Sequence, residues 1–142
     1  MVVEIVNRQR GRAVDPVRWR EFGEKALMAI GSEASGATIA FISDRAMRDL
    51  NSRFRGRVGT TDVLSFPSEQ DEFEKVEGLS LGDVVISVEQ AARQAAEHGL
   101  EFDEEVAQLI LHGLLHLCGY DHESDDGEMN ALELRLRRSL SI

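Results

Sequence analysis

Three of the four histidines in this chain lie within one short stretch, "LHGLLHLCGYDH", which runs from Leu111 to His122. His112 and His116 are four residues apart, so a helix would place both imidazoles on the same side, one turn apart. Two imidazoles in this arrangement can reach one metal ion at about 2.1 Å. The spacing therefore predicts the first two ligands of a metal site.

The third histidine follows a residue that favours the end of a helix. Gly119 tolerates the left-handed backbone conformation in which helices commonly end, and the chain can then turn so that His122 approaches the first two histidines. Three neutral imidazoles leave a tetrahedral ion one open position, where water can bind and be acidified. We therefore expect His112, His116 and His122 to bind one divalent ion. Zinc is the ion we expect, and imidazole also suits nickel and copper.

The surroundings of these histidines predict a buried helix with one polar stripe. Apolar residues occur nearly all round the segment from Asp103 to about Cys118, apart from a stripe formed by Glu105, His112 and His116. Cys118 lies about 240° around the helix from His112, so we interpret it as a small buried thiol and not as a fourth ligand. We interpret His98 as a helix-end residue outside this arrangement, favoured there by the helix dipole.

The remaining elements predict a single α+β domain over residues 1–142. The order β-α-β-α-β-β-α-α-α predicts a four-stranded mixed sheet with about five helices and the metal-binding helix at its centre. The expected strands are Val2–Val6, Ala37–Ile42, Asp62–Pro67 and Leu81–Ser87, the last two forming an antiparallel pair. Two further helices are expected from Pro16 to about Ile30 and from Asp125 to about Leu140. A third follows the Ser43-Asp44 cap, with Met47, Leu50 and Phe54 on its inner face. A fourth begins at a Ser87/Gln90 capping box and ends at His98.

Charge and composition narrow the class of protein. The net charge of −10 argues against a nonspecific nucleic-acid binder, because such proteins neutralise phosphates with basic residues. Of the 16 basic residues, however, 14 are arginines. They gather in three clusters, which we interpret as solvated surface or phosphate contacts: Arg8/Arg10/Arg12, Arg53/Arg55/Arg57 and Arg135/Arg137/Arg138. The acidic stretch "SEQDEFEKVEGLS" is expected to be a solvated loop.

Cysteine usage and hydropathy bear on where the protein resides. The single cysteine excludes an internal disulfide and suits a reducing compartment. No apolar run approaches the roughly 20 residues of a membrane span, and the N-terminus lacks the layout of a signal peptide. We expect a cytoplasmic protein that does not bind membranes.

One family of enzymes shares the histidine spacing but lacks a counterpart for its catalytic base. The pattern H-x-x-x-H-x-x-G-x-x-H is similar to the metzincin proteases, which carry a glutamate directly after the first histidine. Here that residue is Gly113. A peptidase without this general base would lose orders of magnitude in rate, so a metzincin-like protease is the less favoured alternative.

Three blocks between Asn51 and His122 carry a second resemblance. "LHGLLHLCGYDH", read with "NSRFRGRVGTTDVLSFP" and "LGDVVIS", resembles the YbeY family of bacterial metal-dependent endoribonucleases, which act in ribosomal RNA maturation. The resemblance implies that His112, His116 and His122 bind the metal and that the functional arginine is Arg55. It also implies a single-strand-specific enzyme acting at the 16S rRNA 3′ end and in ribosome quality control. Its partners would be the rRNA precursor and the small ribosomal subunit with its proteins, with no DNA expected. Asp62 stands where many members have asparagine.

The chemistry of RNA hydrolysis agrees with this resemblance. Cleavage of a phosphodiester needs charge neutralisation and a positioned nucleophile more than it needs a glutamate base. We take Arg55 and His116 as the catalytic residues: the ion would bind the scissile phosphate or the attacking water, and Arg55 would hold the phosphate in a bidentate clamp. The alternative from another class is a non-catalytic ribosome-assembly factor, in which the metal site contributes stability only.

Overall fold

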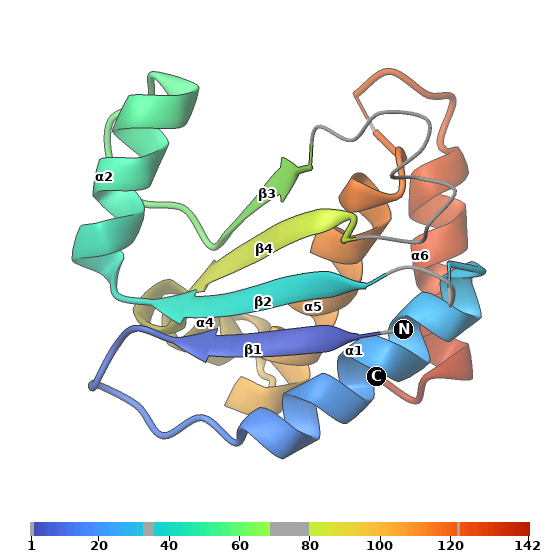
Figure 1. Ribbon diagram of the computed structural model, residues 1–142, viewed down its shortest axis with the longest axis horizontal. Helices are drawn as coiled ribbons and strands as arrows, with labels where there is room; N and C mark the ends of the chain where they lie inside the picture. The colour runs from blue at the N-terminus through green and yellow to red at the C-terminus, as the bar shows by residue number, and fades with distance from the viewer. Residues whose placement is uncertain (1, 33–35, 69–79, 122) are drawn as a thin grey trace.

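A four-stranded mixed sheet organises the molecule (Figure 1). The computed structural model describes residues 2–32, 36–68, 80–121 and 123–142. The sheet order is β1-β2-β4-β3, in which β1, β2 and β4 are parallel and the edge strand β3 is antiparallel to β4. The strands are β1 (Val3–Asn7), β2 (Ala37–Ile42), β3 (Val63–Pro67) and β4 (Gly82–Ser87). The expected α+β architecture, including the antiparallel pair, is confirmed.

The helices begin and end at residues with the right local chemistry. The carboxylate of Asp15 accepts the backbone N–H groups of Val17 and Arg18, and Pro16 occupies the first helical position, where its missing N–H costs nothing. Gly31 ends the same helix with a left-handed φ of 96°. The helices within the described ranges are α1 (Pro16–Ile30), α2 (Asp44–Arg55), α4 (Val88–His98), α5 (Phe102–Leu117) and α6 (Glu128–Ser139). None of them is both long and apolar enough to cross a membrane.

The two faces of the sheet carry cores of unequal size. On one face, residues such as Phe41 and Ile86 pack with α1, α4, α5 and α6 in the main core. On the other face, α2 covers a small cluster made of Ile42, Met47, Leu64 and Val85. Successive strand residues point to opposite faces, so neighbouring residues of β2 and β4 serve different cores. Helix α2 therefore stands apart from the other helices at one end of the sheet, as Figure 1 shows.

Helix α5 lies at the centre of the main core and approaches the sheet closely at one residue. It packs against α1, α4, α6, β3 and β4. A Cβ atom added at Gly113 would lie 2.6 Å from Cγ1 of Val84 on β4 and 3.3 Å from Oγ of Ser65 on β3. The Ser65 hydroxyl donates to the Gly113 carbonyl at 3.2 Å. The sheet therefore occupies the space that a glutamate of the protease motif would need at this position.

Three details of the sequence prediction are wrong. Phe54 was expected on the inner face of α2, but its side chain is 59% exposed and its ring meets that of Phe66 on β3 edge-to-face, with centroids 5.5 Å apart. Ser87 caps α4 by accepting the N–H of Gln90, but the capping box does not close, because the Ser87 N–H donates to Asp62 instead. Helix α6 begins at Glu128, three residues later than expected.

The acidic stretch that was expected to be a solvated loop falls mostly at residues 69–79. These residues lie outside the part of the chain that the structure describes. That expectation therefore stays a prediction.

The variant Gly113→Ala tests the close approach at Gly113, because it sets steric overlap with the sheet against the higher helix propensity of alanine. Alanine is favoured over glycine in a helix by about 1 kcal/mol, but here its methyl group would overlap Val84. We expect a net destabilisation of about 1–3 kcal/mol, as for other overpacked cores, measured by urea unfolding. In the control Gly11→Ala, the new Cβ meets only Oε1 of Gln9 at 3.8 Å, so stability should be unchanged or slightly raised. Stabilisation by Gly113→Ala would contradict the close approach.

Candidate active site

A cleft of about 1210 Å³ runs along the outer edge of β3. Its walls come from the end of α2 and the loop that follows, from β3, and from α4, α5 and α6. The lining residues include Arg55, His112 and His116. Residues from the two faces of the sheet thus meet here, because the cleft passes around the open edge of the sheet.

His112 and His116 lie on α5 with their rings turned toward one another. Their Nε2 atoms are 3.1 Å apart, and the ring planes meet at 80°. Nδ1 of His116 lies 2.9 Å from the carbonyl oxygen of Tyr120, and Nδ1 of His112 lies 2.7 Å from Oε1 of Glu133. A carbonyl and a carboxylate are both acceptors, so each Nδ1 carries a hydrogen. Each Nε2 therefore presents a lone pair, the state that a metal ligand requires.

The spacing of these two nitrogens fits a shared ion. With metal–nitrogen bonds of about 2.0–2.1 Å, a 3.1 Å separation corresponds to a ligand–metal–ligand angle of roughly 95–100°. This angle lies between the octahedral and the tetrahedral value. The third predicted ligand, His122, lies outside the described residues, and no group of three metal-binding side chains occurs among those that are described. The structure thus brings together two of the three predicted ligands.

Glu133 on α6 is the buried partner of the histidine pair. One oxygen accepts from His112, and the other accepts from Arg137 at 2.8 Å. Burial by itself raises the pKa of Glu133, but the hydrogen bond from His112, together with the charge and hydrogen bond of Arg137, outweighs burial and holds that pKa below its usual value. The ionised carboxylate fixes the orientation of the His112 ring.

Arg55 reaches the cleft from the last turn of α2. The loop that follows folds back on the helix, because the buried Asn51 donates from Nδ2 to the Gly59 carbonyl at 3.1 Å. This loop also carries Arg57, which lines the same cleft. The structure therefore places Arg55 and the histidine pair in the lining of one cleft.

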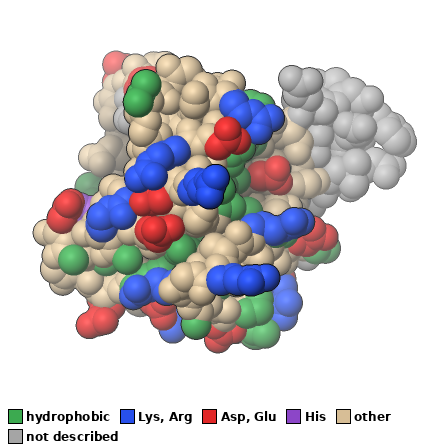
Figure 2. Space-filling model, turned by 90° about the vertical axis from the view of Figure 1, so that its left-hand side faces the viewer, with side chains coloured by type: hydrophobic (Ala, Val, Ile, Leu, Met, Phe, Trp, Pro, Cys, Tyr) green, Lys and Arg blue, Asp and Glu red, His purple; other side chains and the backbone are tan. Residues whose placement is uncertain are grey.

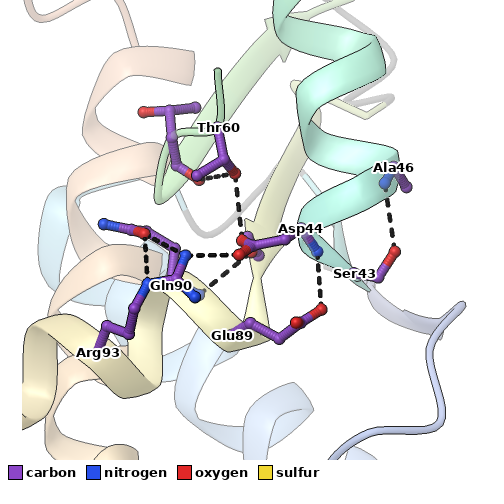
Figure 3. A network of polar contacts seen from close by, with 9 residues as sticks. Ser43, Asp44, Ala46, Thr60, Glu89, Gln90 and Arg93 are labelled. Atoms are coloured by element: carbon purple, nitrogen blue, oxygen red, sulfur yellow. Dashed lines mark hydrogen bonds and ion pairs between the residues drawn. The ribbon is translucent and has the colours of Figure 1, made fainter.

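A polar network at the opposite end of α2 fixes the helix to the rest of the molecule (Figure 3). Asp44 is buried, and its carboxylate accepts from Ser87, from Arg93 and, at 3.2 Å, from Thr60 of the cleft loop. Its backbone N–H donates to Glu89 at 2.9 Å. Burial raises the pKa of Asp44, but these hydrogen bonds and the charge of Arg93 outweigh burial and lower it overall. One carboxylate thus joins α2, α4 and the loop behind Arg55.

Charge on the α2 side of the molecule is mixed. Figure 2 faces this side and shows several Lys and Arg side chains interspersed with Asp and Glu, not a continuous basic surface. Asp62 also lines the cleft, and its Oδ1 accepts the N–H of Val63 at 2.8 Å. The distribution agrees with the acidic net charge and favours local over general attraction of polyanions.

The sequence interpretation missed residues that enter the cleft from other elements. His98 was placed outside the arrangement but lines the cleft, paired with the buried Glu105. Arg137 was interpreted as solvated surface or a phosphate contact, whereas it lines the cleft and binds Glu133. No sequence signal links Glu133 to His112, because 21 residues separate them. The polar stripe on α5 did point to Glu105.

Cys118 takes no part in the cleft lining. Its sulfur lies 3.4 Å from the hydroxyl oxygen of Ser32, and burial raises the pKa of the Cys118 thiol. This environment favours a protonated thiol over a thiolate ligand.

Comparisons with known proteins give consistent results. The sequence matches the family described as endoribonuclease YbeY over residues 4–141. A protein named endoribonuclease YbeY from Geobacter metallireducens is 36% identical over 143 residues, which cover 100% of this chain and 95% of that protein. One of the same name from Nautilia profundicola is 46% identical over 99 residues, covering 70% and 68%. The solution structure of a Thermotoga maritima protein, 26% identical, aligns with a TM-score of 0.63 over 97% of this chain and 88% of that one.

The lowered pKa of Asp44 predicts how its network responds to acid. The ionised form contributes stability above the unfolded-state pKa of about 3.9, and the contribution disappears as pH falls through the lower folded-state pKa. Asp44→Asn should therefore cost about 2 kcal/mol at pH 7, and its difference from the wild type should shrink below about pH 4.

Urea unfolding of both proteins from pH 7 to pH 3 measures this difference. Asp49→Asn, on the exposed face of the same helix, is the control and should change stability little at any pH. A difference between wild type and Asp44→Asn that stays constant over the whole range would refute the assignment.

Proposed function

This chain belongs to the endoribonuclease YbeY family, and on that premise we propose that it is a metal-dependent hydrolase that cleaves phosphodiester bonds of single-stranded RNA. The observation that carries the proposal is the cleft, whose lining includes both the histidine pair of α5 and Arg55 of α2. A divalent cation bound by the histidines and a guanidinium in the same cleft would both suit a phosphate.

His112, His116 and His122 would hold the ion, and zinc suits this donor set best. When bound, the ion would supply Lewis-acid stabilisation of the phosphate and lower the pKa of water. The chain's own groups prepare the ligands: the Glu133 carboxylate and the Tyr120 carbonyl each hold an Nδ1–H and so direct Nε2 of His112 and His116 toward one point.

Arg55 would bind the non-bridging oxygens of the scissile phosphate. A guanidinium offers parallel N–H donors that match two phosphate oxygens, so it both neutralises charge and sets the orientation of the bond to be cut. Arg55 is exposed and lies at the cleft, where RNA can reach it. The hydrogen bond from Asn51 to the Gly59 carbonyl holds the loop that follows Arg55 against α2.

The physiological substrate that we propose is precursor rRNA, cleaved at the 3′ end of 16S rRNA in maturation and ribosome quality control. A protein with a net charge of −10 gains little from general attraction to RNA. A partner that presents the substrate would compensate, and the small ribosomal subunit with its proteins is the partner proposed. This role would place the protein in the cytoplasm. The non-catalytic assembly factor remains the alternative that the following experiment distinguishes.

Cleavage of an unstructured single-stranded RNA tests the proposal directly. We expect the purified wild type to cut the RNA, and His116→Ala, purified identically, to leave it intact because the metal site loses a ligand. The variant also controls for contaminating ribonuclease, which would be present in both preparations. If both proteins cut alike, or neither cuts, the nuclease proposal fails on that substrate and the assembly factor is favoured.

Arg55→Ala tests the phosphate clamp separately. Removing one preorganised donor to a transition-state oxyanion typically costs about 10²–10³ in rate, so kcat/KM should fall about 100-fold with metal content unchanged. Arg48→Ala is the matched control, because Arg48 is an exposed arginine of α2 that does not line the cleft. Undiminished cleavage by metal-loaded Arg55→Ala would remove this role.

A further inference from the structure

A second histidine–carboxylate pair lies in the same cleft. His98, the last residue of α4, places Nδ1 2.6 Å from Oε1 of Glu105 on α5. The Glu105 side chain is 4% exposed, whereas the His98 side chain is 54% exposed. A buried carboxylate needs a partner of this kind, and the imidazole that supplies it stands open to the cleft.

The carboxylate determines what His98 offers to a ligand. Glu105 can only accept when it is ionised, so Nδ1 of His98 donates to it. The other ring nitrogen, Nε2, is then an acceptor in the neutral ring. A fixed tautomer gives the exposed edge of His98 one defined hydrogen-bonding character.

Two glutamine side chains and two leucine side chains line the same cleft as this pair. Gln94 lies one turn before His98 on α4, and Gln108 lies one turn after Glu105 on α5; both line the cleft, as do Leu100 and Leu109. Oε1 of Gln94 is buried and has no hydrogen-bond partner among the described residues. The region therefore combines apolar surface with side chains that can both donate and accept.

This combination suits a nucleobase better than a phosphate. Side-chain amides and a neutral imidazole read the donor and acceptor groups on a base edge, and apolar side chains contact its faces. A phosphate would need cations, and the buried negative charge of Glu105 behind His98 disfavours an anion. Glu105 and His112 are seven residues apart on α5, so about 10 Å separates the two sites. That is too far for His98 to act on the bond under attack.

We propose that His98, held by Glu105, forms with Gln94 and Gln108 a nucleobase-binding subsite for a nucleotide that flanks the cleaved bond. The subsite gives the protein a preference among bases that the histidine pair and Arg55 cannot provide, because those groups address phosphate. The inference rests on the proposed ribonuclease function, since it assigns the ligand to the same RNA.

His98→Asn is the variant that isolates the subsite. The Asn amide nitrogen occupies nearly the position of Nδ1, so it can still donate to Glu105 and spare the fold, but nothing remains where Nε2 was. Ala96→Asn is the matched control, because it adds the same side chain at an exposed position of α4 that does not line the cleft. Thermal unfolding of both variants confirms that each is folded before binding is compared.

Binding is measured by fluorescence anisotropy with labelled 2′-O-methyl homopolymers of A, C and U, checked on a gel to stay intact. We expect wild type and Ala96→Asn to discriminate at least about 5-fold between the best and worst base, the lower end for one good base contact. His98→Asn should reduce this spread to less than about 2-fold. An equal spread in His98→Asn, or no spread in the wild type, would overturn the inference.

A second variant tests the tautomer without removing the imidazole. In Glu105→Gln, the amide can accept from the Nδ1–H of His98 through its oxygen or donate to Nδ1 through its nitrogen, so the tautomer of His98 is no longer fixed. The spread of preference among the bases should then narrow, and an unchanged spread and order would contradict the role of Glu105.

These outcomes distinguish a failure of the subsite proposal from a failure of the nuclease proposal. If the wild type binds with base preference and His98→Asn loses it, but no RNA is cut, the subsite stands and the proposed function fails. If RNA is cut and His98→Asn keeps the preference, the nuclease stands and the subsite fails.

Discussion

Burial of helix α5 on nearly all sides is the constraint on which the active-site geometry depends. Its apolar residues pack against the sheet and three other helices. Because Gly113 has no side chain, the helix can lie close to β4 at this position. Only one stripe of polar residues remains, and a buried polar group must find a partner. The stripe therefore opens on the cleft, where Glu105, His112 and His116 each meet a partner from another segment.

Carboxylates in this acidic protein act mostly as internal supports around the cleft. Asp44 binds Arg93, Glu105 binds His98, and Glu133 binds both His112 and Arg137. Because Arg93 and Arg137 are cations, the fields of Asp44 and Glu133 are partly cancelled before they reach the cleft. Pairing of this kind explains how a chain with net charge −10 can present a site suited to phosphate. Removing one member of a pair would leave a buried charge uncompensated, which is strongly destabilising.

Helix α2, which carries Arg55, packs on the small apolar cluster and not on the main core. The apolar cluster beneath it is small. The hydrogen bonds of Asp44 and Asn51 therefore contribute much of what holds the helix and its loop in place. Elements with few buried apolar contacts are those in which local opening requires the least free energy. The part of the cleft with Arg55 is therefore where local opening should require the least free energy.

Local patterns in the sequence determined the elements and the pairing of the two histidines. Asp15-Pro16 and Gly31 bounded α1, and the four-residue spacing in α5 was enough to place His112 beside His116, because both features depend on backbone geometry within one or two turns. The family blocks indicated Arg55. Tertiary structure decided the rest. Phe54 proved largely exposed, with its ring meeting Phe66 of β3 only edge-on, and Ser87 gave its N–H to Asp62 because β3 pairs there. Glu133, Arg137 and His98 entered the cleft because α4 and α6 pack against α5, and contacts between helices distant in sequence leave no periodic signal from which they could be predicted.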